Sequence, residues 1–200
     1  MSYSNFKNLD EVKQKFNITV SSSGSLFADV PVVKIGNILT AILEENTSLA
    51  LNINTEKARS ELIISPVLVE ARRLLNHQIS LYSGIDFSVD ESQGLNGFCD
   101  FILSQSPDQV FLESPVLCVV EAKNENIKTA YGQCAAEMIA AQIFNQRNQQ
   151  DGIVFGLVTT GSNWKFLKLE QQNLSIDYDE YLISQSDKIL GILLHIMNYH

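Results

Sequence analysis

The stretch that decides the fold is Val116-Leu117-Cys118-Val119-Val120-Glu121-Ala122-Lys123, an uncharged apolar run that ends in two charged residues. An apolar run without alternation is typical of a strand buried on both faces of a sheet. Charges at the end of such a strand are costly to bury unless a partner or a cation compensates them. The pattern therefore predicts a central strand over 116–123, with Glu121 and Lys123 on the same face.

A second isolated charge lies in the apolar segment that precedes this one. Asp100 has two apolar residues on each side, and the segment is predicted to form a strand over 97–103. If the two strands pair as a hairpin, the carboxylates of Asp100 and Glu121 converge on one face of the sheet. The sequence thus predicts a cluster of two acidic side chains and one basic side chain.

This cluster has the residue types of a site for a hard divalent cation. We expect Asp100 and Glu121, with the backbone carbonyl of Ala122, to hold Mg²⁺ or Mn²⁺, because such ions prefer oxygen ligands. A bound metal polarises a phosphodiester oxygen and lowers the pKa of a water. Lys123 is expected to hold or help deprotonate that water and to offset negative charge that develops at phosphorus. The hypothesis is a metal-dependent phosphodiester hydrolase.

Further elements extend outward from the two strands. Their order is helix, three strands, helix, two strands, helix, which favours an α/β (α+β) fold with a mixed sheet flanked by helices. The predicted helices cover 55–76, 126–145 and 186–198, and the predicted strands cover 78–89, 97–103, 116–123, 152–160 and 164–169. Residues 1–53, with short helices over 8–16 and 38–45, are expected to form an accessory segment packed on a domain formed by 54–200.

Composition limits the classes of function. The chain of 200 residues is 45% hydrophobic and 18% charged, enough for one folded domain, and its net charge of −9 argues against a broad basic surface for nucleic acid. Three separated cysteines without a CxxC pair are typical of core thiols in a reducing compartment. No segment has the pattern of a signal peptide or a membrane span. We therefore expect a cytoplasmic protein that does not bind membranes.

The motif residues resemble a known family. Cys99-Asp100, followed after 20 residues by Glu121-Ala122-Lys123, resembles the PD-(D/E)XK nuclease superfamily, with Cys99 in place of the proline. The likeness covers 54–169 and is similar to the N-terminal nuclease domain of type I restriction enzyme R subunits. The further segments that carry it are Thr55-Glu56, Ile63-Ile64-Ser65-Pro66, Gln133 and Thr159-Thr160-Gly161-Ser162-Asn163-Trp164. The resemblance implies a restriction-endonuclease-like core, DNA as the substrate, a defence or repair setting, and a homodimer or a larger restriction or repair complex.

The same resemblance implies further site residues. A glutamine on the helix after the motif strand faces the site in several branches, which gives that role to Gln133 and, one turn on, to Glu137. The first helix in many members supplies a carboxylate near the metal, often through water. Glu61 is the first choice for it, Glu56 the second and Glu70 the third.

Alternative interpretations remain open from the sequence. A catalytically inactive nuclease-fold protein that acts as a binding or regulatory partner fits the acidic balance, because fold does not fix function. Glu56 and Glu61 also fit solvated helix charges, and Trp164 fits a core residue as well as a base-stacking one. The basic residues available for phosphate are Arg59, Arg72, Arg73, Lys165 and Lys168. The three arginines otherwise fit a solvated face.

Overall fold

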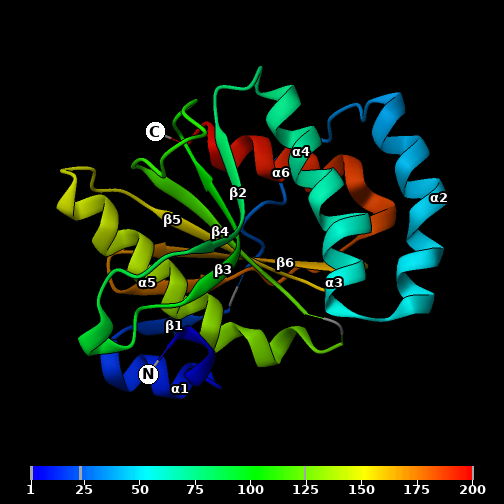
Figure 1. Cartoon of the computed structure of the whole chain (residues 1–200). Helices are drawn as coiled ribbons and strands as arrows, with labels where there is room; N and C mark the ends of the chain where they lie inside the picture. Colours follow the sequence, from blue (N-terminus) through cyan, green and yellow to red (C-terminus); the bar gives the residue numbers. More distant parts are fainter. Residues whose placement is uncertain (1, 23, 124, 200) are drawn as a thin grey trace.

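A mixed sheet lies between two layers of helices (Figure 1). The computed structural model describes residues 2–22, 24–123 and 125–199, and these residues form an eight-stranded sheet. The strand order is β1-β7-β6-β5-β4-β3-β2, and β8 pairs with the start of β6. The strands are β1 (Thr19–Ser21), β2 (Ser80–Asp86), β3 (Phe98–Ser104), β4 (Val116–Ala122), β5 (Val154–Thr159), β6 (Asn163–Glu170), β7 (Asn173–Ile176) and β8 (Tyr181–Leu182). The predicted class, a mixed sheet flanked by helices, is confirmed.

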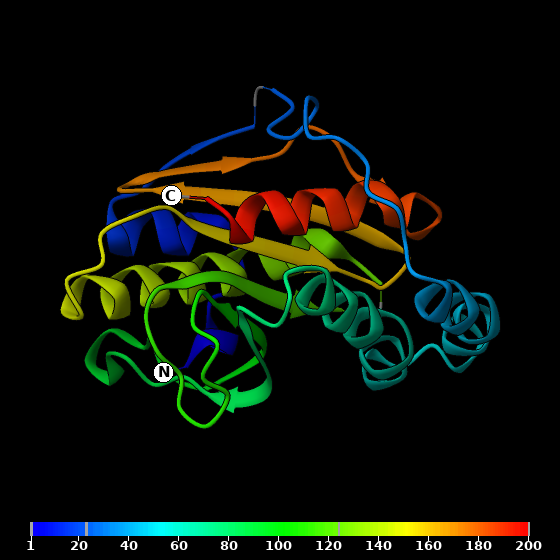
Figure 2. The same cartoon turned by 90° about the horizontal axis from the view of Figure 1, so that it is seen from above.

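Helices cover both faces of this sheet. Figure 1 shows α1 and α5 on one side and α4 and α6 on the other, and Figure 2 shows α2 at the edge of the molecule, beyond α4. The α-helices are α1 (Leu9–Phe16), α2 (Asn37–Ile53), α3 (Glu56–Arg59), α4 (Ser65–Leu74), α5 (Tyr131–Arg147) and α6 (Ser186–Met197). Single turns are η1 (Tyr3–Asn5), η2 (Ser60–Ile64, π-helical), η3 (Glu91–Gln93), η4 (Ile127–Ala130) and η5 (Ile183–Gln185).

β4 is the central strand that the sequence predicts. All of its residues are buried, as expected for a strand covered on both faces. It pairs antiparallel with β3, where Phe101 lies opposite Val120, and parallel with β5 through a crossover that contains α5. The hairpin of β3 and β4, on which the expected convergence of Asp100 and Glu121 depends, is therefore present.

The two faces of the sheet carry separate hydrophobic cores. Val119 of β4 packs with Cys134 and Met138 on the α5 side. On the α4 and α6 side, Trp164 is fully buried with Phe166, and its indole N–H donates to the carbonyl of Gly161 at 2.9 Å. Trp164 is thus a satisfied core residue and is closed to base stacking. These cores hold the central strands rigidly.

The structure corrects several boundaries. Within the segment 1–53, β1 pairs parallel with β7 and extends the sheet. The helix expected over 38–45 runs on to Ile53 as α2. The single helix expected over 55–76 is α3, a π-helical turn and α4 in succession, and Pro66 lies where the π-helical turn passes into α4.

Candidate active site

The three motif residues meet at one end of the sheet, where β4 ends and β3 begins. The Oδ2 of Asp100 accepts a hydrogen bond of 2.7 Å from the backbone amide of Ala122. The Lys123 ammonium donates to Oε1 of Glu121, whose side chain is 1% exposed. The backbone amide of Lys123 donates to the carbonyl of Thr159, which ties this strand end to β5. The structure therefore brings Asp100, Glu121 and Lys123 together.

Glu56 joins this cluster from the helical side. Its Oε2 lies 3.9 Å from Nζ of Lys123, and it occupies the first turn of α3, which Thr55 caps by accepting from the amide of Ala58. Glu61, the first choice from the sequence, lies elsewhere: its side chain is 63% exposed, and its carboxylate lies 3.8 Å from Nζ of Lys57. Glu56, the second choice, is the helix carboxylate that reaches the lysine.

Glu70, the third choice, is also engaged away from the cluster. Its carboxylate forms two hydrogen bonds with the guanidinium of Arg73 and accepts from the amide of Gly36. The hydrogen bonds from the Arg73 guanidinium lower the pKa of Glu70. Burial acts in the opposite direction but is outweighed, so the pKa stays below its ordinary value. Glu70 therefore fixes the start of α2 against α4.

Arg59 holds α3 in the orientation that points Glu56 at Lys123. Its guanidinium donates to the carbonyl of Thr160 at 2.7 Å and to Oδ1 of Asn54 at 2.9 Å. Arg59 is buried, so the interpretation as part of a solvated face is wrong for this residue. Ile63, four residues further on and on the same helical face, is also buried.

Gln133 and Glu137 face the cluster from α5. The Gln133 amide donates to Oε1 of Glu137 at 3.1 Å, and Glu137 is fully buried. Oε2 of Glu137 and Oε2 of Glu121 are both buried with no other group to bond, and the two carboxyl groups face each other, so a proton held by Glu137 can be donated to Glu121. The sequence ranked Glu137 below Gln133, because it could not indicate that Glu137 is the residue that lies inside the protein.

In this cluster the buried carboxyl groups outnumber the single positive charge, that of Lys123. Burial, followed by the charge of Asp100, raises the pKa of Glu121 to about 7. Burial and then the charge of Glu121 raise the pKa of Glu137 well above its ordinary value. Burial also raises the pKa of Asp100 and of Glu56. Burial alone would lower the pKa of Lys123, but the carboxylates, first that of Glu121, outweigh it and raise that pKa.

These residues fit a divalent cation. Three carboxyl groups, those of Glu121, Glu56 and Asp100, act on the single ammonium of Lys123, and the carboxyl group of Glu137 lies buried beside Glu121, so an added positive charge would stabilise the ionised forms. Among the described residues, no group of three or more His, Cys, Asp or Glu side chains is arranged to hold a metal ion by itself. Mg²⁺ commonly binds through one or two carboxylates, with waters and phosphate oxygens as its other ligands.

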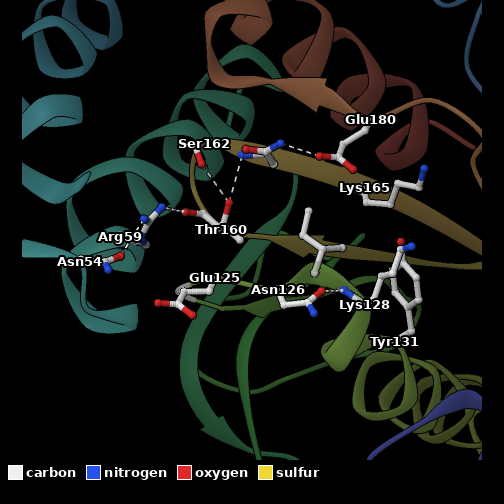
Figure 3. Close-up of a pocket in the computed structure, with 12 residues that line it drawn as sticks. Asn54, Arg59, Glu125, Asn126, Lys128, Tyr131, Thr160, Ser162, Lys165 and Glu180 are labelled. Carbon is white, nitrogen blue, oxygen red and sulfur yellow. Dashed lines mark hydrogen bonds between the residues drawn. The ribbon is translucent and has the colours of Figure 1, made fainter. Parts of the chain in front are cut away.

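A polar pocket of about 600 Å³ lies beside the cluster, where β5 ends and β6 begins (Figure 3). Figure 3 shows Arg59 and Asn54 on one side of the pocket and Lys128 and Tyr131 on the other. The remaining lining residues are Glu125, Asn126, Ile127, Thr160, Ser162, Asn163, Lys165 and Glu180. The end of an open sheet at which parallel strands terminate is a common position for ligands.

Sequence comparisons do not identify relatives for this arrangement. No protein-family model matches the chain, and no curated protein sequence matches it. The likeness to PD-(D/E)XK nucleases thus stays a resemblance of motif residues and of their order along the chain.

Proposed function

We propose that this chain is a Mg²⁺-dependent nuclease of the PD-(D/E)XK type that hydrolyses DNA phosphodiester bonds. The observation that carries the proposal is the meeting of Asp100, Glu121 and Lys123 at one strand end, with the side chain of Glu121 buried. Two carboxylates and one lysine, supplied by the two strands of a hairpin, are the residue types that the family pattern requires.

The surrounding elements support a restriction-endonuclease-like core. The antiparallel strands β2, β3 and β4 are followed by α5 and then by β5, which is parallel to β4. The motif residues lie on the second and third of these strands, and Gln133 lies on the helix that follows them. This is the order of elements that the resemblance implies.

Each residue has a distinct role in the proposed reaction. Asp100 and Glu121, with the backbone carbonyl of Ala122, would hold the cation, which when bound supplies Lewis-acid polarisation of a phosphodiester oxygen and a more acidic water. Lys123 orients that water and places positive charge where negative charge develops at phosphorus. Glu56 keeps the ammonium of Lys123 charged and in place. Gln133 orients Glu137, the buried acid behind Glu121.

The proposal also covers the cellular compartment, the biological role and the partner of the chain. No helix among the described residues is long and apolar enough to cross a membrane. The three cysteines are free and buried, which supports a reducing, cytoplasmic compartment. We infer a defence or repair role, with a second copy of the chain or a larger restriction or repair complex as the partner.

A plasmid-nicking assay tests the hydrolase. The wild type is expected to nick supercoiled DNA with Mg²⁺ or Mn²⁺ and to stop when EDTA is added. Asp100→Asn and Lys123→Ala are expected to lose at least 100-fold in rate, as a rough magnitude for loss of charge stabilisation at the reacting centre, while Glu61→Gln keeps the wild-type rate. Equal activity in all four proteins would point to a contaminant and would reject the proposal.

Metal binding distinguishes the rival function. A catalytically inactive nuclease-fold protein that acts as a binding or regulatory partner would show no nicking under any condition. If calorimetry also detects no binding of Mg²⁺ or Mn²⁺ at millimolar concentrations, the inactive partner is the better description of the chain. Binding that depends on Asp100 would support the nuclease.

A further inference from the structure

Phe98 is an exposed aromatic residue beside the acidic cluster. It is 69% exposed and begins β3, two residues before Asp100, so the two side chains leave the same face of the strand. Residues at such positions lie roughly 7 Å apart. A single exposed apolar side chain is ordinary on a protein surface. What distinguishes Phe98 is its position next to a proposed metal ligand.

The pocket shown in Figure 3 is lined by residues at the ends of β5 and β6, which follow β4 in the sheet on the side away from β3. The amide of Lys123 donates to the carbonyl of Thr159, the last residue of β5, and the next residue, Thr160, lines the pocket. Tyr131 gives the pocket a partly exposed aromatic ring. Burial and then the charge of Glu180 raise the pKa of Tyr131 to about 12, so its hydroxyl is a neutral donor at physiological pH.

These features form a path across one end of the sheet. Along it lie Phe98 on β3, then Glu121 and Lys123 at the end of β4, and then the pocket at the ends of β5 and β6. Neighbouring strands are about 4.8 Å apart, so the path from β3 to β6 is ~14 Å long. A few nucleotides of an extended strand span this distance, with a phosphate over the acidic cluster.

The charges favour one unpaired strand over a duplex. Duplex binding draws its affinity from many Lys and Arg contacts with phosphates, whereas this chain has a net charge of −9. In the pocket, Arg59 donates to Thr160 and Asn54, and Lys165 donates to the carbonyl of Tyr178, which leaves Lys128 as the remaining cation of the lining. Single strands also bind by stacking their bases on aromatic rings, a contact that the paired bases of a duplex do not offer.

We propose that the site binds unpaired DNA, with one base stacked on Phe98 and a neighbouring nucleotide in the pocket beside Tyr131 and Lys128. The inference rests on the proposed nuclease function in one respect: that function places a phosphate at the acidic cluster, between Phe98 and the pocket. Binding itself does not require hydrolysis, so the two proposals are tested separately.

Fluorescence anisotropy with a labelled oligonucleotide tests the inference. A single strand and the duplex of the same sequence are titrated with the protein in Ca²⁺, and a gel verifies that the DNA stays intact. The single strand is expected to bind at least 10-fold more tightly. Phe98→Ala should weaken single-strand binding by roughly 10-fold, in the range that stacking on one ring contributes, and Lys128→Ala should weaken it by a few-fold.

Phe111→Ala is the matched control. Phe111 is 72% exposed and lies between β3 and β4 at the opposite end of the sheet, so its loss should leave binding unchanged. Thermal unfolding of each variant verifies that the fold is retained. The inference is overturned if the duplex binds as tightly as the single strand, or if Phe98→Ala loses no more affinity than Phe111→Ala. If the protein prefers the single strand but does not nick DNA, the proposed nuclease function is rejected and the binding inference stands.

Discussion

The Oδ2 of Asp100 accepts a hydrogen bond from the backbone amide of Ala122 at a distance of 2.7 Å. The pairing of β3 with β4 extends to Phe101 and Val120, so the carboxylate of Asp100 continues the connection where the backbone ladder ends. The carboxylate is thereby held against the strand that carries Glu121 and Lys123. Asp100 thus has two roles that substitution can separate. Its carboxylate accepts a hydrogen bond from β4, and its negative charge is available to a cation.

Substitution of Asp100 should separate these two roles. Asp100→Asn keeps an oxygen for the Ala122 amide, so its free energy of unfolding should stay within ~1 kcal/mol of the wild type, whereas Asp100→Ala should lose about 1–3 kcal/mol by leaving that amide unpaired. Both variants should lose affinity for Mn²⁺. Urea denaturation and calorimetry measure these quantities. Wild-type Mn²⁺ affinity in Asp100→Asn would contradict the assignment of Asp100 as a ligand.

Metal affinity should rise with pH. Burial raises the pKa of Glu121 to about 7, and a proton on this carboxyl competes with the cation. Affinity for Mg²⁺ should therefore increase by roughly 10-fold between pH 6 and pH 8 and level off above that range. Calorimetry in two buffers with different ionisation enthalpies should detect proton release at pH 6.5. Affinity that is constant across this range would show that Glu121 does not ligate the ion.

The stability of the metal-free protein should respond to pH in the opposite sense. The pKa of Glu121 is raised from 4.5 to about 7 in the folded state, so folding takes up a proton between these values. The protonated Glu121 therefore contributes to the free energy of unfolding in full below pH 4.5. This contribution, on the order of 3 kcal/mol, is lost as pH rises through 7. The shift of Glu137 has the same direction.

Glu137→Gln isolates this effect. The variant keeps an oxygen for the Gln133 amide but removes one of the two buried charges. In EDTA, the stability of the variant relative to the wild type should therefore be greater at pH 8 than at pH 5. Thermal unfolding at both pH values checks the sign, and a larger loss at pH 8 would contradict it.

The central strands were predictable because their signals are local. The apolar run before Glu121 and the lone charge of Asp100 indicate two buried strands, and the hairpin follows from their closeness along the chain. The strands β1, β7 and β8 are only three, four and two residues long, which is too short for a periodic pattern. Their pairing with distant partners comes from the tertiary structure.

The choice between Glu56 and Glu61 was not predictable for a related reason. Helical periodicity shows which residues share a face, but not which way that face points. Here the bond from Arg59 to the carbonyl of Thr160, a contact distant in sequence, fixes the rotation of α3. The π-helical turn over Ser60–Ile64 then breaks the regular spacing. Neither the Arg59 contact nor the π-helical turn has a local signal in the sequence.

Glu56 and Glu61 form a matched pair for testing the helix contribution. Glu56→Gln removes a carboxylate 3.9 Å from Nζ of Lys123 and should lower the nicking rate several-fold, because it weakens the positioning of the ammonium. Its effect on stability should stay below about 1 kcal/mol, since the Glu56 side chain is 47% exposed. Glu61→Gln should leave the rate unchanged. If the two variants behave alike, Glu56 has no role at the site.

Asn145 should be required for the position of β4. Its side chain accepts from the amide of Val116 at 2.7 Å and donates to the carbonyl of the same residue at 2.8 Å, where the register of β3 against β4 shifts. Asn145 is 3% exposed, so Asn145→Ala leaves two buried backbone groups unpaired and should cost about 2–4 kcal/mol of unfolding free energy. Asn148→Ala removes one hydrogen bond from an exposed side chain to the carbonyl of Phe144 and should cost much less. Urea denaturation of the two variants measures the difference, and equal losses would show that Asn145 does not clamp the strand.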